Sequence, residues 1–170
     1  GFYGRLLSWK NRKSIIKSLH KNKMNTYFYA PKEDVCHRLC WRQQYNKKWR
    51  LGFKNFIQFS KKYNIDVIVG IAPGLDYNFN ELHDISGDNQ NSDFQLLLKK
   101  AKQLLEDGAN SIALMLDDIP NDFKKKFGVD LSEGIYHGIL ANKLSKELEQ
   151  NIFFVPRIYA DELIKDNPSY

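Results

Sequence analysis

The sequence of 170 residues has only two cysteines and no long apolar run. Cys36 and Cys40 lack a second Cys or His pair at a zinc-like spacing, so we interpret them as two ordinary thiols. No run approaches the ~20 apolar residues that a membrane helix requires. The 170 residues also contain no signal-peptide pattern. We therefore expect no metal site at these cysteines and no membrane contact.

A clustered basic patch is also missing, although the formal net charge is +6. A basic balance can mark a nucleic-acid-binding protein. Here the lysines are scattered along amphipathic stretches such as residues 10–23 and 99–108. We interpret these lysines as solvated helix faces and expect no nucleic-acid partner.

Stretches with apolar residues at helical spacing alternate with short continuous apolar runs. The first pattern predicts helices, and the second predicts strands. Gly108 is a predicted helix stop, and Ser132 is a possible N-cap. The predicted helices cover residues 10–22, 47–63, 93–107, 132–149 and a short piece at 160–165, the predicted strands cover 24–31, 65–74, 110–117 and 151–157, and a long loop covers 76–92.

Continuous apolar strands that alternate with helices of this length predict an α/β fold with a parallel sheet. Two architectures satisfy the pattern: an open doubly wound sheet and part of a (β/α)8 barrel. No G-x-G-x-x-G follows the first strand, so nothing favours a nucleotide-binding open sheet.

Polar residues follow every predicted strand. Lys32 follows the first strand, Asp76 the second, Asp117 the third and Tyr159 the fourth. The carboxyl ends of parallel strands meet at one edge, which is the catalytic face of a barrel and the ligand crevice of an open sheet. We therefore expect a functional site at this edge.

The stretch SIALMLDDIP, residues 111–120, ends a buried strand with two adjacent acids, Asp117 and Asp118. Helix capping explains one of them, not both. Two carboxyl groups so close do not both ionise freely, so we expect one to stay protonated. That division suits glycoside hydrolysis, in which a protonated carboxyl group donates to the leaving oxygen. A pair of carboxylates could also hold a metal ion, since hard cations take carboxylate oxygens.

Five blocks together resemble glycoside hydrolase family 84, the group of O-GlcNAcases and bacterial β-N-acetylglucosaminidases once called hyaluronidase-like. They are GFYGR (1–5), MNTYFYAPKED (24–34), HRLCWRQQY (37–45), APGLD (72–76) and LMLDDI (114–119). The resemblance implies a (β/α)8 TIM barrel. Residues 1–170 would be the N-terminal part of one catalytic domain, from the end of strand 1 to about strand 5. We therefore expect a fragment of about half a barrel, which alone is poorly folded or inactive.

The same resemblance implies roles for individual residues in a retaining, substrate-assisted reaction that passes through an oxazoline. Asp117 would orient the acetamido N–H of the sugar, and Asp118 would be the general acid and then the general base. Gly1 would contact the sugar through its carbonyl, Lys32 would bind a sugar hydroxyl, and Tyr159 would bind near the acetamido oxygen. No metal or organic cofactor is implied.

Some positions are expected to be structural, and others depart from the family pattern. We expect Tyr3 and Asp76 to support the site and His137 to be a buried, satisfied histidine. Tyr159 falls where the family has the Tyr of a Pro-Thr-Glu-Tyr block. The two central residues here are Arg157 and Ile158, so only the ends of the block agree. The family also often has Arg-Pro-Trp after GFYG, where this chain has residues 5–7 as Arg-Leu-Leu.

The sequence thus predicts a β-N-acetylglucosaminidase that acts on terminal N-acetylglucosamine of a glycan or a glycosylated protein. Two alternatives stay open. One is a non-catalytic carbohydrate-binding remnant of the same barrel. The other is a metal-dependent hydrolase with Asp117 and Asp118 as ligands.

Overall fold

The chain forms alternating strands and helices in the order that the sequence predicts. The computed structural model describes residues 4–83, 91–117, 119 and 132–164. Among these residues, no helix is long and apolar enough to cross a lipid bilayer. The elements are α1 (Trp9–Lys21), β1 (Thr26–Tyr29), α2 (Lys47–Lys61), β2 (Asp66–Ile71), the 3-10 helix η1 (Phe79–His83), α3 (Asp93–Glu106), β3 (Ser111–Met115), α5 (Glu133–Glu147), β4 (Phe153–Val155) and α6 (Asp161–Ile164).

The predicted elements are confirmed, although the strands are shorter than expected. The loop predicted over 76–92 contains η1, and its residues 84–90 lie outside the described part. Gly108 ends α3 with φ +105°, a conformation that favours glycine. Ser132 stands at the N-cap of α5 without a side-chain cap hydrogen bond.

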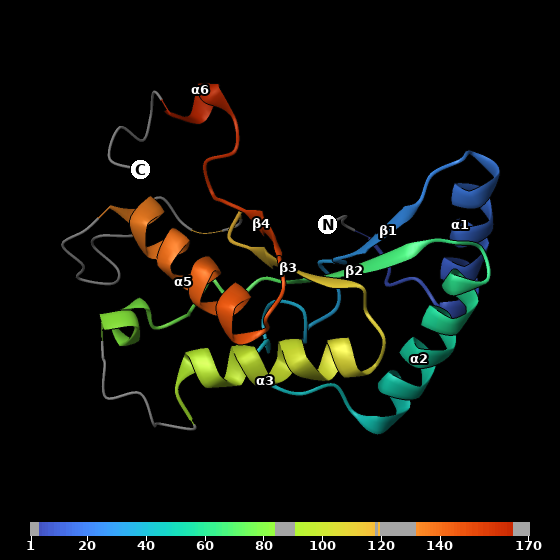
Figure 1. Cartoon of the computed structure of the whole chain (residues 1–170), viewed down its shortest axis with the longest axis horizontal. Coiled ribbons are helices and arrows are strands. Elements are labelled where there is room, and N and C mark those ends of the chain that lie inside the picture. The colour runs from blue at the N-terminus through green and yellow to red at the C-terminus, as the bar shows by residue number, and fades with distance from the viewer. Residues whose placement is uncertain (1–3, 84–90, 118, 120–131, 165–170) are drawn as a thin grey trace.

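The four described strands form one parallel sheet in the order β1-β2-β3-β4. Phe28 pairs with Ile68, and Gly70 pairs with Ala113, which in turn pairs with Phe153. Each strand is therefore the neighbour of the next one along the chain. The three connections run through α2, α3 and α5, which Figure 1 shows next to the sheet.

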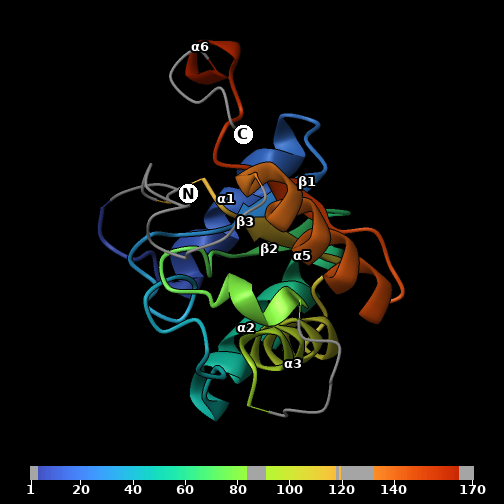
Figure 2. The same cartoon turned by 90° about the vertical axis from the view of Figure 1, so that its left-hand side faces the viewer.

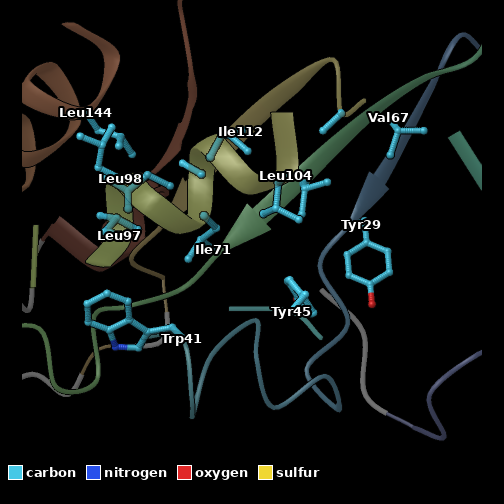
Figure 3. Close-up of a cluster of buried hydrophobic side chains, with 14 of the residues drawn as sticks. Tyr29, Trp41, Tyr45, Val67, Ile71, Leu97, Leu98, Leu104, Ile112 and Leu144 are labelled. Carbon is cyan, nitrogen blue, oxygen red and sulfur yellow. The ribbon is translucent and has the colours of Figure 1, made fainter. Parts of the chain in front are cut away.

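One face of the sheet packs against the helices and forms the main core. Side chains alternate between the two faces of a strand, and every second strand residue belongs to this helix face. In Figure 3, Tyr29, Val67, Ile71 and Ile112 from three strands lie with Leu104 of α3 in one apolar cluster. The strand residues of this face are Tyr27, Tyr29, Val67, Val69, Ile71, Ile112 and Leu114, and their helical partners include Ile16, Phe53, Phe56, Leu97, Leu104, Leu140 and Leu144.

The opposite face carries a second, much smaller cluster, to which no helix contributes a described residue. We call it the alanine-rich face, and it comprises Ala30, Ile68, Ala72, Ala113 and Met115 with the partly buried Val155. Phe28 in β1 and Phe153 in β4 are 41% and 51% exposed, respectively. Their registers place them on this face too. Figure 2 shows α2 and α3 together on one side, whereas α6 lies far from them. The helices α1, α2, α3 and α5 contribute to the main core and none of them to the alanine-rich face, so among the described residues the helix layer covers one face of the sheet.

The close approach of α1 to α2 depends on a glycine. A Cβ atom added to Gly52 would lie 2.1 Å from Nε1 of Trp9. The Trp9 ring is packed within an aromatic group that includes Tyr29, Trp49 and Phe56. The indole therefore has little room to move away from a side chain at position 52.

We predict that Gly52→Ala destabilises the protein. Alanine favours a helix over glycine by up to about 1 kcal/mol, but the clash with Trp9 opposes this gain. We expect a net loss of about 1 to 3 kcal/mol in the free energy of unfolding, as is typical of overpacking. Chemical denaturation of the full-length protein followed by circular dichroism measures this change.

The matched control is Gly138→Ala in α5, where an added Cβ meets no atom within 4 Å. This variant should gain stability from helix propensity alone. Equal gains in both variants would show that the contact between α1 and α2 is looser than described.

Candidate active site

The described segments that follow the four strands all leave the sheet at its carboxyl edge. The strands end at Tyr29, Ile71, Met115 and Val155. The amide of Leu116 donates a hydrogen bond of 2.8 Å to the carbonyl of Val155, so the ladder between β3 and β4 continues to the residue before Asp117. Asp117 is therefore held at the end of a hydrogen-bonded strand rather than in an unsupported loop.

Two of the predicted site residues, Lys32 and Asp117, meet at this edge. Nζ of Lys32 lies 3.5 Å from Oδ2 of Asp117, and the two side chains are 7% and 20% exposed. Lys32 stands in a turn two residues beyond Ala30, and Asp117 stands in a turn two residues beyond Met115. Ala30 and Met115 both belong to the alanine-rich face, so the ion pair lies just past the end of this face.

The contact between Lys32 and Asp117 spans the line of β2, because β2 separates β1 from β3. Neighbouring strands lie about 4.8 Å apart, so only a long side chain can bridge two intervals. On this face β2 and its end carry Ile68, Gly70 and Ala72. A Cβ atom at Gly70 would meet Sδ of Met115 and the ring of His37, so neighbouring side chains already fill the space over this position.

The second carboxylate oxygen of Asp117 has no hydrogen-bond donor among the described residues. Oδ1 is buried and accepts no hydrogen bond from any residue that the structure describes. A buried carboxylate oxygen without a donor is costly. Lys32 holds one oxygen of the carboxylate, and the other is suited to accept an N–H or O–H group from a bound molecule.

The other predicted site residues are not joined to this pair. Tyr159 lies between β4 and α6 and is 67% exposed. Its hydroxyl has no hydrogen bond to any described residue. Gly1 and Asp118 lie outside the described residues, as does Tyr3. The structure therefore brings together Lys32 and Asp117 and leaves the remaining assignments as predictions.

Asp76 is a structural support, as predicted, and it belongs to a wider network. It accepts hydrogen bonds from Nε1 of Trp41 at 2.7 Å and from Nη1 of Arg42 at 2.5 Å. Arg42 also makes a bidentate contact with Asp93, at 2.6 Å on both nitrogens. Hydrogen bonding to Asp93 raises the pKa of the Arg42 guanidinium. Arg42 thus ties the segment after β1 to the segment after β2 and to the first turn of α3.

A second arginine fixes the segment after β4. Arg157 contacts Glu133 at the start of α5 through Nε and Nη2, both at 2.6 Å. Nε2 of His137 lies 3.7 Å from the same carboxylate. His137 is fully buried, as predicted, and burial together with the charge of Arg157 lowers its pKa to about 3. The departure from the family block at position 157 therefore creates an ion pair inside the protein.

Sequence reasoning missed Arg42, Asp93 and Glu133 as partners at this edge. Arg42 lies within the HRLCWRQQY block, which was a signal, but its partners are distant in the sequence. The described residues contain no group of three or more His, Cys, Asp or Glu side chains that could hold a metal ion.

The sequence is similar to a family model and to proteins of known activity. A family model described as beta-N-acetylglucosaminidase matches residues 1–168. The proteins named Protein O-GlcNAcase from Rattus norvegicus and Mus musculus are each 35% identical to the chain over 122 residues. Those residues are 72% of this chain and 12% of either relative.

Two solved structures share the fold. The structure of CpGH84B has a TM-score of 0.76 and 32% identity, with 94% of this chain and 26% of that chain covered. A variant O-GlcNAc hydrolase from Thermobaculum terrenum has a TM-score of 0.78 and 24% identity, with 94% and 34% covered. The chain thus spans about a third or less of the proteins that it matches. With nearly every residue matched by the family model, the chain belongs to the β-N-acetylglucosaminidases of glycoside hydrolase family 84.

Proposed function

We propose that the sheet is an arc of a (β/α)8 barrel, with the alanine-rich face toward the barrel axis. Sequential strand order, parallel pairing and a helix layer on one face support this arrangement. A doubly wound sheet would carry helices on both faces. The partial exposure of Phe28 and Phe153 is consistent with further strands beyond this arc.

We further propose that the protein containing this chain is a retaining β-N-acetylglucosaminidase. Its substrate would carry a terminal N-acetylglucosamine, either on a glycan or on a serine or threonine of a protein. The observation that carries this proposal is the ion pair of Lys32 and Asp117 at the carboxyl edge, with Oδ1 of Asp117 buried and without a described donor. Membership of the family adds the reaction class.

In this mechanism Asp117 accepts the N–H of the 2-acetamido group. The hydrogen bond turns the acetamido oxygen toward C1 and stabilises the positive charge that grows as the oxygen attacks. The bond from C1 to the acetamido oxygen forms while the bond from C1 to the glycosidic oxygen breaks. The product of this step is a protonated oxazoline, whose ring N–H stays hydrogen-bonded to Asp117, so no protein nucleophile is required.

Asp118 would donate its proton to the leaving glycosidic oxygen in the same step. The resulting carboxylate then takes a proton from water, whose oxygen attacks C1 and opens the oxazoline. Two displacements at C1 restore its original configuration. Asp117 and Asp118 would thus perform two different tasks, and neither task requires a metal ion.

We predict that the two acids respond differently to the leaving group. Asp118→Ala should lower kcat by about 10²–10⁴ on substrates with a poor leaving group, which is typical of a lost general acid. The loss should be much smaller on an activated aryl N-acetylglucosaminide, which departs without protonation. Asp117→Asn should lower kcat on both substrates, because the acetamido group is no longer oriented. Steady-state kinetics of the full-length protein with both substrate types measures this difference.

Asp161→Asn is the matched control, because Asp161 is an exposed carboxylate of α6. Its kinetics should equal those of the wild type. Activity that disappears with EDTA would support the metal-dependent alternative. Sugar binding without turnover by the wild type would support the non-catalytic alternative.

We predict that Lys32→Met chiefly raises KM. The loss of one charged hydrogen bond to a sugar hydroxyl corresponds to about 1.5 to 3 kcal/mol, or about 10- to 100-fold in kcat/KM. Lys17→Met is the control, since Lys17 is exposed on α1. An unchanged KM in Lys32→Met, measured on the full-length protein, would remove Lys32 from the substrate site.

A further inference from the structure

The segment that carries Lys32 also contains a buried carboxylate with no assigned role. Asp34 follows Lys32 by two residues and is 5% exposed. No lysine or arginine among the described residues forms an ion pair with it. Burying a carboxylate is costly unless it is compensated by hydrogen bonds, so the contacts of Asp34 reveal what holds it in place.

Both oxygens of Asp34 accept hydrogen bonds. Oδ2 accepts from the hydroxyl of Tyr29 at 2.6 Å and from the hydroxyl of Tyr45 at 3.0 Å. Oδ1 accepts from the backbone amide of Cys36 at 3.0 Å. Burial and the charge of Asp34 raise the pKa of both tyrosines, so their hydroxyls stay protonated and remain donors.

The backbone of Asp34 closes the turn that contains Lys32. Its amide donates to the carbonyl of Pro31 at 3.0 Å, across Lys32 and the next residue. Its carbonyl accepts from the amide of His37 at 2.9 Å. One residue thus fixes the turn on both sides through its backbone and anchors it through its side chain.

The anchor is the rigid aromatic part of the core. Tyr45 stacks on Trp49 with ring centroids 3.6 Å apart, and Tyr29 meets the same ring edge-on at 5.8 Å. Both tyrosines belong to the main core, and Figure 3 shows Tyr29 at the end of β1 with Tyr45 nearby. Lys32 follows Ala30 of the alanine-rich face by two residues, so Asp34 ties the turn after β1 to the helix-side core.

We propose that Asp34 is a positioning residue, which sets the place of Lys32 relative to Asp117 by tying the Lys32 turn to Tyr29 and Tyr45. Lysine has a long and flexible side chain, so its ammonium is well placed only if its backbone is fixed. If the turn loosens, Nζ of Lys32 moves away from the carboxylate of Asp117, although no side chain of the site has been removed. The consequence for catalysis rests on the proposed function, whereas the geometric consequence does not.

The test is a double-mutant cycle in the full-length protein with Asp34→Asn and Lys32→Met. Because small displacements in a site carry large kinetic costs, Asp34→Asn alone should raise KM about tenfold. In the Lys32→Met background it should change KM by less than about twofold, since a residue that acts through Lys32 has nothing left to position. The melting temperature should fall by the same amount in both backgrounds. An equal rise of KM in both backgrounds overturns the proposal.

Tyr45→Phe is a milder variant in case Asp34→Asn does not fold. It removes one of the two hydroxyl donors and should give a smaller rise in KM, again absent in the Lys32→Met background. Asp107→Asn is the matched control: this carboxylate is 3% exposed and pairs with Arg50 at the opposite end of the sheet, before β3. It should lower the melting temperature and leave KM unchanged.

A measurement without substrate separates this proposal from the proposed function. Lys32, with a side chain only 7% exposed, should be acetylated slowly by acetic anhydride, as followed by mass spectrometry. In Asp34→Asn its rate should approach that of the exposed Lys17, and in Asp107→Asn it should not change. Faster labelling in a protein without turnover would support the positioning role and refute the function. An unchanged rate in Asp34→Asn would refute the positioning role even in an active enzyme.

Discussion

The alternation of side chains along parallel strands is the constraint on which this structure depends. It sends Tyr29, Val69 and Ile112 to the helices and Ala30, Ala72 and Ala113 to the other face. The large side chains therefore pack on one side of the sheet, and the ion pair of Lys32 and Asp117 lies beyond the ends of β1 and β3. A one-residue shift in the register of β3 would exchange these roles and move Asp117 into the apolar core.

Ion pairs between residues of this chain hold the segments at the carboxyl edge of the sheet in place. Arg42 joins Asp76 to Asp93, and Arg157 joins Glu133. Each arginine links segments that follow different strands or precede a helix. The loops at this edge are therefore fastened to one another and to the starts of helices.

Much of this arrangement is readable from the sequence, because it depends on local patterns. Continuous apolar runs give the strands, helical spacing gives the helices, and Pro73-Gly74 or Asp117 marks where strands stop. The partners of Asp34, Arg42 and Arg157 are not readable in this way. They lie up to tens of residues away, and their pairing follows from how loops fold over the edge. Gly52 is similar: only the position of Trp9 shows why a side chain is not accommodated there.

Because β2 lies between the strands that carry Lys32 and Asp117, the two side chains mark the ends of a chord across a twisted surface. The length of that chord is the distance across two strand intervals, and the core on the helix side of the sheet fixes the positions of all three strands. A substitution in this core that moves β1 relative to β3 would therefore change the separation of the ammonium and the carboxylate without touching either group.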